Sequence, residues 1–362
     1  MGRVKRYRRS FYNDRIYWVK RIGGWVLVAA VLFGVGFLVA PRLLDLGTSI
    51  WYSTVRGQDA DSTSQADSPA SSTAQATPAP TPTASPVPAD TVTDGAWATL
   101  SLSALSSPEA IYQAASDLKA QGVAYALVPL KDASGYIYYA SALPGAAGSI
   151  AATTVDAGMI AQALTEQGIV PVAYLCAFQD PISVYTDRSM AIHLRDSDYL
   201  WLDAASAEVG GKPWMNPYSD TAVQFIGDLI AEVSGLGYQQ VVLSAVQFPS
   251  YVSEKQDFGD TAGLDRAGIL AQDIAAWDQR FAGQVVLWYE VPYDSCVTPS
   301  TTLGSVTPDA LGIQNLMIRQ DEPVAADATP TQDEVIASLQ GGGCTHVALR
   351  QGSSITLVSG SN

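Results

Sequence analysis

Apolar, strand-like runs alternate with helical patterns after Asp94, and this alternation constrains the fold more than any other feature of the chain. Most runs are continuously apolar, as is typical of parallel strands that are covered on both faces of a sheet. Helical patterns lie between several of them, at Pro108–Gln121, Asp156–Gln167, Ala222–Ser234 and Ala262–Phe281. The strand-like runs are Trp97–Leu102, Ala124–Leu130, Val170–Phe178, Val241–Phe248, Val285–Glu290, Ile313–Arg319 and His346–Arg350.

These repeated units predict an α/β fold, a (β/α)8 TIM-like barrel over residues 94–362. The sequence does not locate the eighth strand, and the phrase YLWLD (199–203) could form a hairpin inside a long loop. A doubly wound open sheet is the alternative. Because no GxGxxG or Walker sequence follows a strand-like run, the nucleotide-binding role usual for that fold is not expected.

A basic head and an apolar run precede the barrel region. Residues 1–21 form the head, and Ile22–Ala40 follows without a charged residue. A helix of this length can cross a hydrocarbon core of about 30 Å. Since positive charge stays on the cytoplasmic side, we expect a single-pass membrane protein with its N-terminus inside and its C-terminal domain outside. The alternative is a cleaved signal peptide, whose apolar region is usually only about 7–15 residues long.

Residues 41–93 join the predicted membrane helix to the barrel. Within them, residues 57–93 contain no Leu, Ile, Phe, Tyr or Trp, and prolines are frequent between Pro69 and Pro88. Such a segment cannot bury an apolar core. We therefore expect a juxtamembrane segment and a solvated linker that holds the barrel away from the membrane.

Charge and metal-ligand content exclude several classes of function. From Gly57 onward the chain has ten Lys or Arg residues and 33 Asp or Glu residues, a net charge of −23. Nucleic-acid binding is not expected, because so acidic a surface repels phosphates. The two histidines, His193 and His346, lie far apart in sequence, so neither a metal site nor a cofactor is predicted. The pairing of Cys296 with Cys344 stays open.

Four phrases in order make the barrel region similar to a known family. They are LVPLKDASGYIYYAS (127–141), GIVPVAYLCAFQDPISV (168–184), WMNPYSDTAVQFIGDLIAEVSGLGYQQVVLSAVQFP (214–249) and VVLWYEV (285–291). Together they resemble a glycoside hydrolase family of bacterial surface barrels. The resemblance covers most of residues 94–362, and it implies a TIM-like barrel that acts on a polysaccharide.

The departures from the family pattern fall where catalytic groups are expected. The family's fourth strand ends in a phrase like Asp-Tyr-Val-Arg-Phe-Pro, whereas this chain has Ser244, Ala245, Val246, Gln247, Phe248 and Pro249 at the matching positions. Glycoside hydrolysis generally requires two carboxyl groups beside the scissile bond. Serine and glutamine side chains can form hydrogen bonds to a sugar, but they cannot give or take up the proton that hydrolysis requires. The substitutions indicate a degenerate active site.

The remaining candidate residues divide into two groups. Asp180 and Glu290 follow strand-like runs and are the candidate catalytic pair, although the sequence does not give their separation. Asn216 is also predicted to cap the following helix, with Pro217 at its first position. Strand alternation sends Ser244 and Gln247 to opposite faces unless the chain bulges or has left the strand by Gln247. The candidate substrate-binding residues are Lys131, Asp132, Trp214, Asn216, Tyr218, Ser244, Gln247 and Trp288.

Three hypotheses of function remain. The first is a membrane-anchored, extracellular domain that binds cell-surface or cell-wall polysaccharide with weak or no hydrolytic activity. The second is an active polysaccharide hydrolase that uses Asp180 and Glu290. The third is a structural or partner-binding protein of the cell wall.

Overall fold

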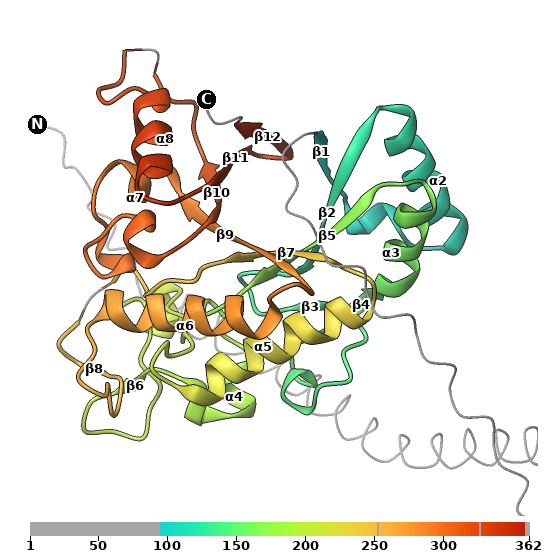
Figure 1. Cartoon of the computed structure of the whole chain (residues 1–362). Helices are drawn as coiled ribbons and strands as arrows, with labels where there is room; N and C mark the ends of the chain where they lie inside the picture. Colours follow the sequence, from blue (N-terminus) through green and yellow to red (C-terminus); the bar gives the residue numbers. More distant parts are fainter. Residues whose placement is uncertain (1–94, 252, 326, 359–362) are drawn as a thin grey trace, which may run out of the picture. The chain divides into compact units, whose positions relative to one another are not determined.

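Eight strands close into a ring at the centre of the structure, a computed structural model that describes residues 95–251, 253–325 and 327–358 (Figure 1). These residues belong to the second of two compact units, Thr83–Asn362. The predicted head, the apolar run Ile22–Ala40 and the linker lie outside the described residues. No helix in the described ranges is long and apolar enough to span a bilayer.

The strand ring confirms the predicted TIM-like barrel. Seven of its strands run parallel to one another and correspond to the seven predicted runs. They are β1 (Ala96–Thr99), β2 (Val123–Lys131), β5 (Val170–Cys176), β7 (Gln240–Ser244), β9 (Val286–Pro292), β10 (Asn315–Gln320) and β11 (His346–Gln351). The eighth, β12 (Ser354–Val358), pairs antiparallel with both β11 and β1 and closes the ring. A tight turn at Gly352, φ +58°, joins β11 to β12 where a regular barrel would have a helix.

Short strands lie outside the ring in two places. β3 (Ile137–Tyr139) pairs with the end of β2, and β4 (Ile150–Val155) pairs with β3. The register of β2 against β5 shifts between Pro129 and Lys131, because proline has no N–H for the ladder. β6 (His193–Leu194) and β8 (Gln256–Asp257) form a separate pair, and a bridge joins His193 to Leu200. YLWLD, in the long β5–α5 connection, therefore adds a bridge to this small sheet, whose other strand, β8, comes from the β7–α6 connection.

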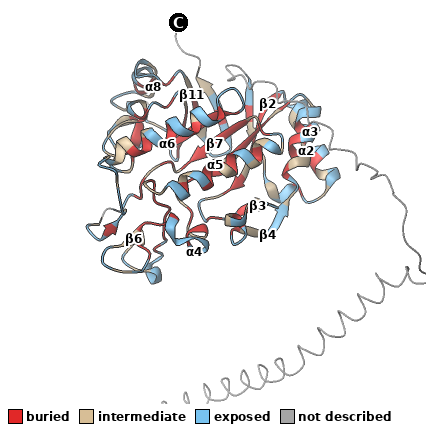
Figure 2. Cartoon of the chain, turned by 60° about the horizontal axis from the view of Figure 1, so that its bottom comes forward, coloured by how far each residue is buried: buried red, intermediate tan, exposed pale blue. Residues whose placement is uncertain are grey.

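Helices cover the outside of the ring, with α5 and α6 side by side (Figure 1). Figure 2 shows that their buried faces point toward the strands and their exposed faces point outward. The longer helices are α2 (Pro108–Ala120), α3 (Ala157–Glu166), α5 (Asp220–Gly235), α6 (Arg266–Phe281) and α8 (Gln332–Gly341). Short helical segments are α4 (Ser183–Thr186), α7 (Tyr293–Val297), η1 (Leu102–Ala104), η2 (Pro144–Ala146), η3 (Arg188–Met190), η4 (Ala207–Val209), η5 (Thr301–Leu303) and η6 (Pro308–Leu311).

The predicted capping role of Asn216 is wrong. Helix α5 begins at Asp220, and the Ser219 side chain caps it by accepting a hydrogen bond from the Ala222 N–H. Asn216 Oδ1 instead accepts from the N–H of Tyr218 at 3.0 Å, which folds the chain into a turn before the helix. Ser219 was the better N-cap candidate, because it directly precedes the acidic first turn.

Two apolar cores lie on the two sides of the ring. The inner core contains only strand residues: Trp97, Tyr125, Leu127, Val172, Val242, Val286, Trp288, Met317, Ala348 and Ile355. The larger outer core joins the strands to the helices, with Ile226 and Ile230 of α5 and Ile274 and Trp277 of α6 among its members. Alternate residues of each strand therefore face the barrel interior.

Candidate functional site

Period-two alternation along the strands predicts which side chains reach the mouth of the barrel. Val286 and Trp288 face the inner core, so Glu290 is the next inward residue of β9. In the same way Tyr174 follows Val172, and Ser244 follows Val242. Arg319 and Arg350 follow Met317 and Ala348. A polar layer thus sits above the apolar inner core, at the carboxyl ends of the strands, where barrel enzymes place their active sites.

A cavity of about 260 Å³ opens at this polar layer. Its lining comes from the ends of β2, β5, β7, β9 and β10 and from the connections that follow them. The lining residues are Asp132, Ala133, Tyr174, Cys176, Gln179, Ser244, Ala245, Gln247, Glu290, Pro292 and Arg319. We call this the mouth cavity. A different hollow, lined by residues at the amino ends of β9 and β10, lies at the opposite end of the barrel.

Glu290 is the more deeply buried of the two acids that line the mouth cavity. Its side chain is buried, and Tyr174 donates a hydrogen bond to Oε1 at 2.8 Å. Arg350 pairs with Oε2 at 2.5 Å, and Nη1 of Arg319 lies 3.6 Å from Oε1. Both carboxylate oxygens therefore already have donors from the protein.

Arg350 and Tyr174 form a single unit with this carboxylate. The guanidinium carbon of Arg350 lies 4.8 Å from the centre of the Tyr174 ring. Burial raises the pKa of the Tyr174 phenol, and the adjacent Glu290 charge raises it further. Burial alone would lower the pKa of Arg350, but Glu290 and Tyr174 outweigh it and raise that pKa above its usual value. Tyr174 thus stays a neutral donor and Arg350 stays a cation.

Asp132 is the second carboxylate that lines the mouth cavity. Its Oδ1 accepts hydrogen bonds from the N–H groups of Ser134 and Tyr136, at 2.9 and 3.1 Å. Its Oδ2 accepts from the Tyr138 hydroxyl at 2.6 Å. Asp132 therefore shapes the turn between β2 and β3 and also lines the cavity.

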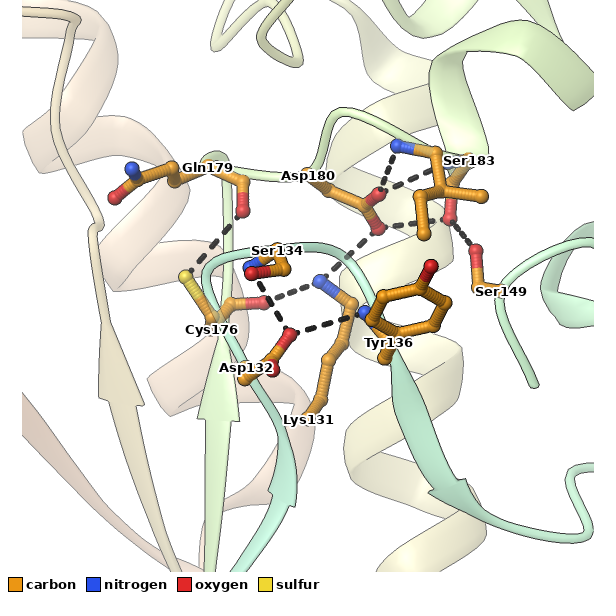
Figure 3. Close-up of polar contacts among 10 residues, drawn as sticks. Lys131, Asp132, Ser134, Tyr136, Ser149, Cys176, Gln179, Asp180 and Ser183 are labelled. Carbon is orange, nitrogen blue, oxygen red and sulfur yellow. Dashed lines mark hydrogen bonds and ion pairs between the residues drawn. The ribbon is translucent and has the colours of Figure 1, made fainter. Parts of the chain in front are cut away.

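Asp180 is not part of the cavity lining and forms a buried ion pair with Lys131 (Figure 3). Lys131 Nζ is 3.0 Å from Asp180 Oδ2 and donates to the Cys176 carbonyl at 2.7 Å. Ser183 donates to the same carboxylate from both its N–H and its hydroxyl. Burial alone would raise the pKa of Asp180, but Lys131 and the Ser183 bonds outweigh it and lower that pKa. Neither Asp180 nor Lys131 lines the mouth cavity.

Ser244 and Gln247 both reach the cavity because the chain leaves the strand between them. β7 ends at Ser244, and Ala245 follows with φ +53°, in the left-handed region that residues other than glycine rarely adopt. This bend redirects the backbone, so Gln247 lines the same cavity as Ser244. Strained backbone of this kind clusters at functional sites.

The other proposed substrate-binding residues lie elsewhere. Trp288 is fully buried in the inner core, where its Nε1 donates to Gln240. Trp214 is buried and donates to Asp203 Oδ2 at 2.8 Å. Asn216 and Tyr218 line a separate cavity beside the start of α5.

Sequence reasoning did not identify Gln179, Arg319 and Arg350 as site residues. The usable signal for the two arginines was the period-two pattern of β10 and β11, which sends them inward beyond Met317 and Ala348. All three described cysteines are free and buried, so Cys296 and Cys344 are not paired in this structure. Among the described residues, no group of three or more His, Cys, Asp or Glu side chains could hold a metal ion.

One part of the barrel is similar to a known protein family. A family model described as "putative glycosyl hydrolase domain" matches residues 99–278. The barrel is glycoside-hydrolase-like. The match includes Asp132, Ser244 and Gln247 but ends before Glu290, Arg319 and Arg350. A search of curated proteins found no match.

Solved structures of similar shape are distant in sequence from this glycoside-hydrolase-like barrel. A hypothetical protein from Ruminiclostridium thermocellum has a TM-score of 0.46 and 18% identity, over 53% of this chain and 96% of that chain. A chitobiase from Flavobacterium johnsoniae has a TM-score of 0.46 and 10% identity, over 71% of this chain and 38% of that chain. The glycoside hydrolase domain of a PelA variant from Pseudomonas aeruginosa has a TM-score of 0.38 and 13% identity, over 70% of this chain and 81% of that chain.

Proposed function

We propose that this glycoside-hydrolase-like barrel binds a polysaccharide of the cell surface or cell wall without hydrolysing it. The domain would stand outside the cell on the linker of residues 41–93, held by a membrane helix at Ile22–Ala40. The proposal of an anchor and an exterior location rests on the basic head and the length of the apolar run alone.

The observation that carries the proposal is how the protein already binds the carboxylates of Asp180, Glu290 and Asp132. A glycosidase needs one carboxyl group that gives a proton and another that acts as base or nucleophile. Asp180 is buried in its pair with Lys131 and does not line the cavity. Glu290 and Asp132 do line it, but protein donors already bond to both oxygens of each. This arrangement favours fixed hydrogen-bond acceptors over a proton-exchanging pair.

The lining of the mouth cavity suits the hydroxyl groups of a sugar. Ser244, Gln247 and Gln179 can donate and accept hydrogen bonds without carrying charge. A cavity of about 260 Å³ lies below the usual range for drug-sized ligands, which is roughly 300–1,000 Å³. It therefore suits one sugar ring of a longer chain.

The net negative charge of the chain indicates which class of glycan it can bind. The chain from Gly57 onward carries ten basic and 33 acidic residues, so it repels polyanions at a distance. We therefore propose an uncharged or basic glycan in preference to an anionic one. Raising the salt concentration should not weaken binding of an uncharged glycan.

The experiment compares binding to neutral and anionic polysaccharides by the full-length chain in detergent. Gln247→Ala should weaken binding to the neutral glycan by about tenfold, the effect of losing roughly 1.4 kcal/mol. Gln162→Ala, an exposed glutamine on α3, is the matched control and should bind like the parent. Equal binding by both variants would contradict a sugar site at the barrel mouth.

A further inference from the structure

A second cavity, of about 420 Å³, lies in the connections that leave the barrel after β5 and β7. Tyr199 and Trp201 come from the β5–α5 connection, and Tyr251 comes from the β7–α6 connection. The same two connections supply Gln179 and Gln247 to the mouth cavity. Both cavities are thus built on the face where parallel strands end.

Two exposed aromatic rings distinguish this second cavity. Tyr199 is 76% exposed and Tyr251 is 46% exposed. Beneath Tyr251 lies the buried Trp201, whose ring is 5.9 Å away and inclined by 17°, so the two are stacked. Grouped apolar side chains on a surface usually mark a site of interaction. Aromatic rings with a polar edge suit partners that have both an apolar face and hydroxyl groups.

Backbone hydrogen bonds fix the chain that carries Tyr199 and Trp201, and the stacked Trp201 ring supports Tyr251. β6 and β8 pair the two connections directly, and the Arg195 N–H donates to the Lys255 carbonyl at 2.8 Å. The Leu194 N–H donates to the Tyr199 carbonyl at 2.9 Å, and the Trp201 N–H donates to the Ile192 carbonyl at 2.9 Å. A rigid platform loses less conformational entropy on binding than a mobile loop does.

We propose that this cavity, the aromatic subsite, binds a second segment of the glycan whose other segment occupies the mouth cavity. The apolar faces of its sugar rings would lie on Tyr251 and Tyr199. Their hydroxyl groups would bond to Ser206, Ser253 and Lys255, which supply the polar part of the lining. This inference rests on the proposed function and extends it to a neutral chain long enough to reach both cavities.

Length-dependent binding tests the aromatic subsite. Neutral chito-oligosaccharides and cello-oligosaccharides, from disaccharide to hexasaccharide, are titrated into the full-length chain in detergent by calorimetry. The parent should bind at least one hexasaccharide more tightly than its disaccharide. Tyr251→Ala and Tyr199→Ala should each weaken that hexasaccharide by about tenfold, the equivalent of roughly 1.4 kcal/mol. Both should leave disaccharide binding at the mouth cavity within about twofold of the parent.

The control is Tyr185→Ala, because Tyr185 is 62% exposed on α4 and lines neither cavity. Tyr251→Phe keeps the ring and should restore hexasaccharide binding if Tyr251→Ala has lost only the stacking contact. Equal affinities for the hexasaccharide and the disaccharide in the parent would overturn the aromatic subsite and leave the mouth cavity standing. A parent that binds none of these glycans would contradict the proposed function as well.

Discussion

The buried ion pair of Lys131 and Asp180 provides a stability test that separates a structural acid from a catalytic one. Both side chains are 1% exposed or less. Removing one partner of such a pair typically costs about 3–5 kcal/mol, because the remaining charge stays buried and unpaired. Asp180→Asn and Lys131→Met should each therefore lower the free energy of unfolding by about 3–5 kcal/mol, a large part of the roughly 5–15 kcal/mol of a typical domain.

The double variant shows whether the two residues act together. With both charges removed, no unpaired charge remains, so Lys131→Met with Asp180→Asn should cost less than the sum of the single variants by about 1–3 kcal/mol. Urea unfolding, followed by tryptophan fluorescence, gives the midpoint and slope for each variant. A loss below about 1 kcal/mol for Asp180→Asn would refute the reasoning and restore Asp180 as a candidate acid.

The pH dependence of the same pair has a definite sign. The folded-state pKa of Asp180 lies below its ordinary value of 3.8. The pair therefore contributes its full stability above pH 3.8, and that stability is lost as the pH falls through the folded pKa. The Asp180→Asn variant should not show this loss of stability as the pH falls.

Three other variants or treatments test separate parts of the structure. Asp273 on α6 is buried, its Oδ2 has no hydrogen-bond partner among the residues that the structure describes, and burial and Asp220 raise its pKa from 3.8 to about 8. The folded state thus holds a proton that the unfolded chain releases, and stability falls as the pH rises from 3.8 toward about 8. Asp273→Asn should raise the unfolding free energy by up to about 4 kcal/mol near pH 7 and hardly at all near pH 4; an equal effect in urea titrations at both pH values would contradict this. Ala245→Gly should raise the urea midpoint by the equivalent of about 1 kcal/mol, because glycine adopts positive φ without strain; a lower midpoint would count against strain at this bend. Protease added to intact cells should release the barrel while the basic head stays protected, whereas recovery of a soluble protein that begins near Pro41 would favour a signal peptide.

The sequence predicted the fold well because continuously apolar strands carry a strong local signal. The runs Val241–Phe248 and Val285–Glu290 begin with the uninterrupted apolar stretches 241–243 and 285–289, and they became β7 and β9 of the ring. β12 was missed because it is exposed at alternate positions and turns back from β11 without a helix. Neither feature matches the repeated strand-and-helix unit that identified the other strands.

The candidate site was harder to predict, because it depends on side-chain direction and on partners distant in sequence. Asp180 and Glu290 both follow strand-like runs, yet Asp180 turns away from the cavity to meet Lys131. The bend at Ala245 brings Gln247 to the cavity, and local sequence does not encode that positive φ. Trp214 pairs with Asp203, eleven residues earlier in the chain, within an irregular connection where no periodicity applies.

The most direct test of the central claim measures reducing ends released from a neutral glycan that the full-length chain binds. Across about pH 4–8, where a glycosidase carboxyl pair ordinarily works, the parent should release none above a heat-denatured control. Glu290→Gln should also release none. Turnover in the parent that disappears in Glu290→Gln, with the urea midpoint retained, would contradict the account and assign the chemistry to Glu290.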